Sequence, residues 1–404
     1  MFAANTGFMI ICSALVFLML PGLALFYGGL VQNRNILSTT MHSLILLGVG
    51  SVFWAVIGYS LAFGTDHGGV IGGLDYFLLN GVGQAGDGPV DTIPHVLFMI
   101  YQCMFTCLTP ALISGAYAER IKFPAMVMFS LLWLFLVYAP LAHWVWGGGW
   151  LAQYGALDFA GGAVVHMSSG AAALAAAHAL GRRKALESGE VAPHNLPLTI
   201  LGAGLLWFGW FGFNAGSATA ASPLAANALA TTQLSTAAAM VGWLAVELFH
   251  RGQISCLGAA SGALAGLVAI TPAAGFVTPM ASLPIGFIGG AVCYGGVILK
   301  QLFKYDDALD VVGIHGIGGT WGALATGIWA TVTVNPDGAD GLLYGHPGQL
   351  WIQFVSVVAT WVFCYLASRL IFKIVACYTP LRAAEAEEST GLDLVEHNER
   401  AYQF

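Results

Sequence analysis

The sequence predicts an all-α polytopic membrane protein with eleven transmembrane helices. Of its 404 residues, 58 % are hydrophobic and only 8 % are charged, and the mean hydropathy is +0.78. An ordinary soluble domain is about 25 % charged. Folded in water, this chain would expose apolar patches far larger than soluble monomers tolerate, so most of its surface must face lipid. The 53 glycines favour close approach between packed helices.

Eleven apolar windows are long enough to cross the hydrocarbon layer, which takes about 20 helical residues. Clusters of Gly, Pro and Asp separate them, as in 64–75 and 335–341. The windows are 8–30, 41–63, 94–117, 122–141, 161–181, 197–214, 228–249, 254–271, 282–303, 313–332 and 349–375. We therefore expect one membrane domain over residues 1–377 and a short tail over 378–404, rich in acidic residues.

The basic residues order these windows across the membrane. They lie between the first and second, third and fourth, fifth and sixth, and seventh and eighth windows, close the ninth and eleventh windows, and continue into the tail: Arg34, Arg120, Lys122, Arg182, Arg183, Lys184, Arg251, Lys300, Lys304, Arg369, Lys373, Arg382 and Arg400. All thirteen fall on one side only if the count of spans is eleven. The positive-inside rule then predicts an external N-terminus and a cytoplasmic C-terminus, in a plasma or inner membrane.

The opposite side carries only acidic charge among its predicted loops: Asp66, Asp75, Asp87, Asp91, Asp158, Asp337 and Asp340. Such a surface favours the approach of cations. Loop aspartates also cap helices and form turns, which is an equally good explanation for any single one. The seven cysteines form no C-x-x-C pair and lie almost wholly in apolar runs, so neither a disulfide framework nor a metal site is expected.

Ten of the windows divide into two halves of five, over about 7–181 and 196–332, followed by the final helix 349–375. The fifth window of each half contains a histidine preceded by an aspartate, in DFAGGAVVHMSSG from Asp158 and DVVGIHGIGG from Asp310. Because five is odd, the second half must enter the membrane in the opposite direction, as in the inverted repeats of transporters. The competing explanation is chance similarity between helices rich in small residues, since the two Asp–His spacings differ.

His166 and His315 lie in the middle of these apolar windows, where an ionisable side chain is costly and usually functional. Burial disfavours a charged imidazole, so we expect both rings to be neutral. The repeat would place them near its two-fold axis, so we expect them to face each other across one lumen. Two other interpretations remain: satisfied interhelical hydrogen bonds, and paired ligation of a haem. Neutral imidazoles could not replace the hydration shell of a metal cation, whereas ammonium can leave its proton behind and enter as ammonia.

Nine stretches, in order, resemble the ammonium transporter family (Amt/Mep, with the rhesus proteins as distant relatives) over nearly the whole chain. They are PGLALFYGGLVQNRNILS from Pro21, GAYAERIKF from Gly115, AHWVWGGGWL from Ala142, ALDFAGGAVVH from Ala156, HNLP from His194, WFGFNAGSA from Trp210, AASGALAGLV from Ala259, DDALDVVGIHG from Asp306 and GLDLVEHNERAY from Gly391. The resemblance implies that His166 and His315 are the twin histidines of an ammonia pore.

The resemblance also assigns the outer part of that pore. Trp146 and Ser217 match the site that recruits ammonium, and Phe105 and Phe213 match a stacked phenyl gate beneath it, with Phe105 also beside the recruited ion. Tyr101 departs from the family, which commonly has phenylalanine beside this site. Without the motifs, core packing would be the better explanation for Phe105 and Phe213, and a tryptophan at the membrane interface the better one for Trp146.

Two aspartates are expected to support the pore without touching the ion. Asp158 matches an aspartate that the family places just below the outer vestibule, and Asp310 occupies the corresponding position before His315.

The family further implies a homotrimer with one pore per subunit, transport of ammonium with methylammonium as an analogue, and nitrogen uptake. The tail keeps the family-like GLD, His397, Glu399 and Tyr402, which favours a cytoplasmic PII-type signalling partner. Apart from lipid, we expect no cofactor, metal or nucleic acid.

Three alternatives to transport remain: an ammonium sensor of the same fold, a haem electron carrier, and a water or glycerol channel. The channel is disfavoured because the paired Asn-Pro-Ala half-helices are missing. An enzyme is not expected, since no nucleophile, base and oxyanion donor cluster in the spans.

Overall fold

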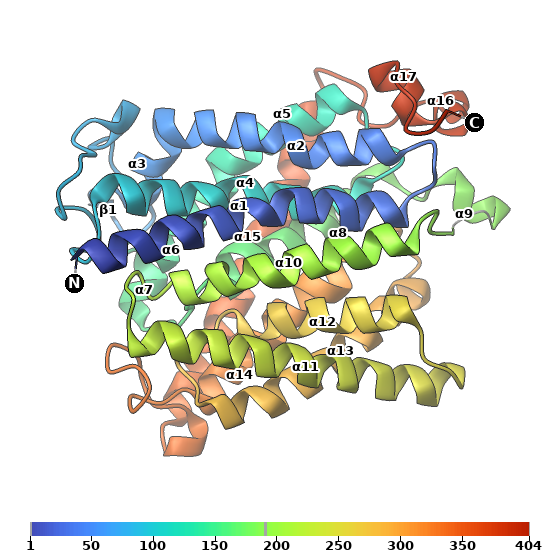
Figure 1. The fold of residues 1–404 in the computed structure, drawn as a ribbon. Coiled ribbons are helices and arrows are strands. Elements are labelled where there is room, and N and C mark those ends of the chain that lie inside the picture. The colour runs from blue at the N-terminus through green and yellow to red at the C-terminus, as the bar shows by residue number, and fades with distance from the viewer. Residues whose placement is uncertain (1, 190–191, 404) are drawn as a thin grey trace.

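Long apolar helices run side by side through the whole molecule (Figure 1). A computed structural model describes residues 2–189 and 192–403. The N-terminus and the C-terminal tail lie at opposite ends of these helices, which we call the N-terminal end and the tail end. Over the described ranges the only strands are β1 (Asp66–His67) and β2 (Ile71–Gly72), a short antiparallel pair.

Several of the long helices change to π-helical geometry partway. The first half contains α1 (Phe2–Leu30), α2 (Ile36–Phe53) with η1 (Trp54–Gly58) and α3 (Tyr59–Phe63), α4 (His95–Tyr117), α5 (Phe123–Trp133) with η3 (Leu134–Tyr138) and α6 (Ala139–Val145), and η4 (Gly162–Met167) with α8 (Ser168–Leu180). The second half contains α10 (Leu196–Gly216), α11 (Pro223–Arg251), α12 (Cys256–Ile270), α13 (Pro279–Phe303) and η5 (Val312–Gly316) with α14 (Ile317–Trp329), and the final long helix is α15 (Pro347–Ala376). The short helices are η2 (Phe77–Leu79), α7 (Trp150–Tyr154), α9 (Lys184–Ser188), η6 (Leu342–Tyr344), α16 (Glu385–Thr390) and α17 (Leu392–His397).

Nine helical runs are long and apolar enough to cross a membrane, counting only the part of the chain that the structure describes. They coincide with nine of the predicted windows. The other two windows, 254–271 and 313–332, fall on the 15-residue helix α12 and on the run Val312–Trp329. The prediction of a helical, multi-pass chain is therefore confirmed, and the exact number of crossings stays a prediction.

Glycines permit the closest contacts between helices. Gly202 of α10 faces the backbone of Phe26 on α1, and Gly286 of α13 faces the backbone of Ser235 on α11. A Cβ atom at either glycine would collide with the neighbouring backbone. Close packing of apolar helices without a hydrophobic driving force depends on such small residues.

The C-terminal tail folds back onto the helix ends (Figure 1). Oδ1 of Asp393 in α17 accepts a hydrogen bond from the N–H of Ser38, in the first turn of α2, at 2.8 Å. Asn35 precedes α2 but does not cap it. Its Oδ1 accepts instead from the N–H of Leu392, at the start of α17, also at 2.8 Å. Asp393 of α17 thus caps the start of α2, and Asn35, directly before α2, caps the start of α17.

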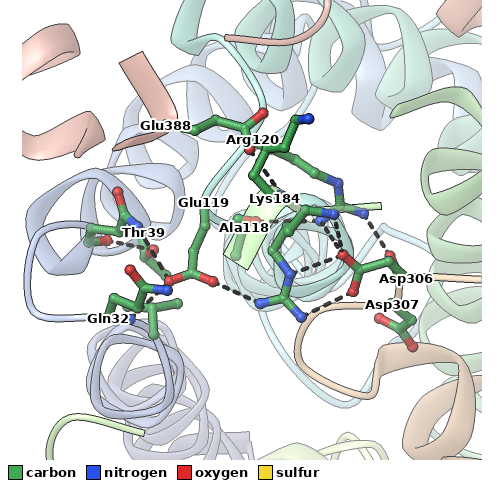
Figure 2. Close-up of polar contacts among 12 residues, drawn as sticks. Gln32, Thr39, Ala118, Glu119, Arg120, Lys184, Asp306, Asp307 and Glu388 are labelled. Carbon is green, nitrogen blue, oxygen red and sulfur yellow. Dashed lines mark hydrogen bonds and ion pairs between the residues drawn. The ribbon is translucent and has the colours of Figure 1, made fainter. Parts of the chain in front are cut away.

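A buried ion network joins the connections between helices at the tail end (Figure 2). Arg183 donates to both carboxylate oxygens of Asp306 at 2.9 Å and to Oε2 of Glu119 at 2.7 Å. Arg120 lies 4.0 Å from the same Asp306 carboxylate. Burial would raise the pKa of Asp306, but the hydrogen bonds and charges of the two arginines hold it below its usual range. Loops far apart in sequence are therefore fixed to one another.

Replacing Asp393 with alanine is expected to uncap α2 and to loosen the tail. The loss of an N-cap costs about 1 kcal/mol, so we expect a lower thermal midpoint in detergent and faster proteolysis after residue 378. Glu385→Ala is the matched control, because that carboxylate pairs with Lys184 at the surface and is 76 % exposed. Equal protease sensitivity of the two variants would contradict the capping role.

Candidate functional site

A file of aromatic rings runs through the interior, built from three helices. Tyr101 and Phe105 lie one turn apart on α4 with ring centroids 5.0 Å apart. The Phe105 ring is 4.4 Å from the Phe213 ring of α10 and 6.0 Å from Trp146, which follows α6. Tyr101, Phe105 and Phe213 are buried and Trp146 is half-buried. The structure therefore brings together the four aromatic residues predicted for recruitment and gating.

Two hydroxyl groups meet beside these rings, at the end of α10. The Ser217 hydroxyl donates to the Phe213 carbonyl at 2.9 Å, and the Tyr101 hydroxyl donates to the same carbonyl at 2.7 Å. The two hydroxyl oxygens are 3.3 Å apart. On the other side of Phe105, the indole N–H of Trp146 donates to the Asp158 carbonyl at 3.0 Å. All the residues predicted to recruit the substrate thus form one connected cluster. We call Trp146, Phe105, Tyr101 and Ser217 the recruitment cluster.

His166 and His315 continue this file toward the middle of the molecule. The His166 ring stacks 6.0 Å from Phe213 and 5.3 Å from His315. Nδ1 of His315 and Nδ1 of His166 are in hydrogen-bond contact at 3.2 Å, and both side chains are buried. One of these nitrogens must donate and the other accept, so at least one imidazole is neutral. The contact leaves no room for an iron between the two nitrogens, which disfavours the haem alternative.

The two histidine-bearing segments cross in close contact. A Cβ on Gly170 of α8 would collide with the backbone of Gly316, directly after His315. A Cβ on Gly319 of α14 would meet the Gly162 carbonyl and Cβ of His166. Because Gly162 lies by Gly319 while Gly170 lies by Gly316, the segments run in opposite directions.

Asp158 organises the start of the first histidine segment. Its carboxylate accepts hydrogen bonds from the N–H groups of Gly161, Gly162 and Ala163 at 2.6–2.8 Å. Burial raises the pKa of this carboxyl, while the three backbone N–H groups act in the opposite direction. Asp158 therefore satisfies the free N–H groups at the beginning of η4.

Asp307, rather than Asp310, takes this position in the second segment. Oδ2 of Asp307 accepts from the N–H of Val312 at 2.6 Å, at the start of η5. Asp158 lies eight residues before His166, and Asp307 lies eight residues before His315. Asp310 is half-buried and pairs with Lys300. The assignment of Asp310 as the counterpart of Asp158 is corrected accordingly, because the geometry of the helix start requires a carboxylate one turn earlier.

Two aromatic residues in the site were missed at the level of sequence. The Trp210 ring stacks 5.2 Å from His166, and its position three residues before Phe213 on α10 was a signal for this contact. Tyr27 of α1 lines a cavity of about 10 Å³ next to His315. Apart from these residues the lining is apolar: Met19, Leu23, Phe26, Leu112, Leu206, Leu264, Leu309 and Ile314. The cavity holds about one water-sized molecule.

The site offers aromatic faces, hydroxyl oxygens and imidazoles rather than a metal cage. Within residues 2–189 and 192–403, no group of three His, Cys, Asp or Glu side chains could hold a metal ion.

The profile of the Ammonium Transporter Family matches residues 7–402.

The chain belongs to the ammonium transporter family.

Its relatives cover almost the whole chain. It is 56 % identical to the ammonium transporter of Bacillus subtilis (strain 168) over 400 residues, which are 99 % of this chain and 98 % of that protein. The crystal structure of Saccharomyces cerevisiae Mep2 superposes with a TM-score of 0.89 at 36 % identity, over 95 % of this chain and 88 % of Mep2. A structure titled "Sensor Amt Protein" superposes equally well, with a TM-score of 0.89 at 29 % identity over 98 % of both chains. This member of the ammonium transporter family is a multi-pass protein of the cell membrane.

Replacing Gly170 with alanine is expected to force the histidine segments apart. The added methyl would collide with the Gly316 backbone, whereas a Cβ on Gly204 of α10 meets nothing within 4 Å. Gly204→Ala is therefore the matched control, and it should be neutral or stabilising because alanine favours helix by up to about 1 kcal/mol. We expect Gly170→Ala to lose more than about 2 kcal/mol, through overpacking, and most of its transport. Unfolding midpoints and flux that match the control would refute this packing constraint.

Asp307 predicts a measurable dependence of stability on pH. Burial raises its pKa from 3.8 to about 6, with Lys300 opposing that shift and Asp310 adding to it. Between these pH values the folded protein keeps a proton that the unfolded chain has lost, so stability falls as pH rises from about 4 to 6.

Asp307→Asn removes this titration and keeps an acceptor for Val312. At pH 7.5 we expect it to be more stable than the unsubstituted protein by up to about 3 kcal/mol, at about 1.4 kcal/mol per pKa unit. The difference should shrink toward pH 4.5 in thermal unfolding scans. A difference that is constant with pH would show that Asp307 does not titrate in this range.

Proposed function

We propose that this protein transports ammonium across the cell membrane by conducting it as ammonia, with the proton left in the water outside the gate. The observation that supports this most strongly is the buried, hydrogen-bonded pair His166 and His315 at the end of a continuous file of aromatic rings. At least one imidazole of that pair is neutral, so it offers a polar contact to ammonia without a fixed positive charge.

Recruitment takes place where the row of aromatic rings begins, on the side of the N-terminal end of the molecule. The faces of Trp146, Phe105 and Tyr101 supply cation-π contacts, worth about 0.5–2 kcal/mol each, and the Ser217 oxygen accepts a hydrogen bond from the ion. Below them the Phe105 and Phe213 rings are in contact and close the path. A hydrated or charged species would lose its solvation here, so the ion returns its proton to the water outside the gate before ammonia enters.

The passage beyond the gate is narrow and mostly apolar. Ammonia passes His166 and His315 and the small cavity lined by Tyr27. A cavity of about one molecule's volume, with a single hydroxyl and one imidazole among apolar walls, suits a neutral polar solute rather than a hydrated ion.

We also propose eleven membrane crossings, an external N-terminus and a cytoplasmic C-terminus. The two halves, about 7–181 and 196–332, form an inverted repeat, with the final helix over 349–375. The equal spacings from Asp158 to His166 and from Asp307 to His315 support this, as does the antiparallel crossing of the two segments. The location of Arg34, Arg120 and Arg183 at the tail end agrees with the positive-inside orientation.

Residues 1–377 then form the transport domain and 378–404 a cytoplasmic regulatory tail. We propose a homotrimer with one pore in each subunit, in the plasma or inner membrane. A PII-type signalling protein would bind at the tail end, where the tail is docked on α2 and the N–H of Ala383 donates to the Arg120 carbonyl at 2.9 Å.

An ammonium sensor is the second candidate, because the chain superposes closely on a structure titled as a sensor Amt protein. A sensor would bind ammonium through the same recruitment cluster and transmit binding through its tail. Flux separates the two functions, since a sensor leaves the vesicle interior unchanged.

The decisive experiment is transport by purified protein in liposomes. We expect vesicles with the protein to take up ammonium and methylammonium, and His166→Ala to lower that flux at least about tenfold or to admit potassium, because the polar contact in the pore is lost. His397→Ala, at the tail, is the control and should retain flux. Unchanged flux and selectivity in His166→Ala would refute the role of the histidine pair, and inert vesicles would favour the sensor.

A further inference from the structure

Three side chains of the recruitment cluster carry a polar hydrogen, and each has an acceptor for it within the protein. The Trp146 indole donates to the Asp158 carbonyl, and the hydroxyl groups of Tyr101 and Ser217 have the Phe213 carbonyl and each other as partners, with the Gly212 carbonyl 3.1 Å from Tyr101. A carbonyl oxygen has two lone pairs, so Phe213 can accept from both hydroxyls at once. The cluster therefore presents π faces and oxygen lone pairs without a free donor.

The end of α10 explains why the Phe213 carbonyl takes hydroxyl donors. The last carbonyls of a helix lack partners within the helix. The N–H of Ser217 turns to the Asn214 carbonyl at 3.2 Å, and side chains approach the Phe213 carbonyl instead. Gly216 makes the approach of Tyr101 sterically feasible, because a Cβ there would lie 2.7 Å from the phenol oxygen. The phenol is thus built into the helix end rather than placed there by chance packing.

We propose that Tyr101 and Ser217 form an acceptor-only pair of oxygens that receives two N–H groups of one ammonium ion. Each hydroxyl oxygen keeps a lone pair after donating its hydrogen. Their 3.3 Å separation lets one small tetrahedral cation contact both. Ammonium carries only donors, whereas anions and neutral acceptors find no donor in the cluster. Tyr101 is thereby a specificity-determining residue, and the phenol oxygen is what this chain adds where the family commonly has phenylalanine.

This inference deepens the proposed transport function and rests on its recruitment step. It does not require the phenol to hold the fold together. If Tyr101 were only a strut for α10, its loss would change the maximal rate or the stability, with no specific effect on the affinity for ammonium. Measuring the half-saturating ammonium concentration and the maximal rate separately therefore distinguishes the two roles.

The test compares Tyr101→Phe, Ser217→Ala and the double variant in proteoliposomes. Each single variant should raise the half-saturating ammonium concentration about tenfold, as expected for one lost hydrogen bond to a charged group, with maximal rates within about twofold. In the double variant the half-saturating concentration should rise by much less than the product of the two single increases, because groups that bind one ligand together are coupled. Ser217→Thr keeps the hydroxyl and should therefore retain a clearly higher affinity for ammonium than Ser217→Ala.

Tyr59→Phe is the matched control, because the buried Tyr59 hydroxyl contacts Nε2 of His95 at 2.6 Å outside the cluster. It should leave the half-saturating concentration unchanged. An unchanged value in Tyr101→Phe, or a fall in its maximal rate alone, would overturn the proposal. If Tyr101→Phe does not fold, Ser217→Ala against Ser217→Thr decides, and equal affinities of those two would overturn it as well.

Calorimetric titration of the same proteins with ammonium chloride in detergent repeats the comparison without transport. Coupled binding losses in protein that carries no flux would refute the proposed transport and leave the acceptor pair standing. Protein that transports ammonium but whose two affinity losses simply multiply in the double variant would support transport and overturn the acceptor pair.

Discussion

The crossing of two backbones without intervening side chains determines the centre of this molecule. Gly170 lies so close to Gly316 that a Cβ atom at position 170 would collide with the Gly316 backbone. This contact brings His166 and His315, 149 residues apart in the chain, into hydrogen-bond contact. The aromatic file above the histidines and the small cavity beside them are both defined relative to this crossing. A single methyl group there would move all of these parts, because packed helices do not deform continuously.

Carboxylates placed at helix starts solve a second problem of this fold. Backbone N–H groups at the beginning of a helix have no partner within it, and lipid offers none. Asp158 and Asp307 serve the two histidine segments, and Asp393 serves α2 from the tail. With so few charged residues in the chain, each of these carboxylates has a structural role. The docking of the tail is consequently coupled to the integrity of a transmembrane helix.

The proposed selectivity follows from how protons are distributed in the recruitment cluster and the pore. Trp146, Tyr101 and Ser217 all have acceptors for their polar hydrogens within the protein, so the outer cluster offers only acceptors and π faces. The histidine pair offers one shared hydrogen bond in an apolar passage. A cation with N–H groups suits the first environment, and the neutral molecule left after deprotonation suits the second. The contacting rings of Phe105 and Phe213 separate the two.

The amino-acid sequence by itself determined much of this architecture, because lipid imposes a simple demand on composition. Apolar windows of sufficient length, basic residues on alternating connections, and two histidines within such windows are properties of the linear chain. The shared role of Asp307 with Asp158, the stacking of Trp210 on His166, and the mutual capping of α2 and α17 were decided only by the tertiary structure. Those features depend on distances between residues that are far apart in sequence, and a linear pattern carries no such distances until helix packing brings the residues together.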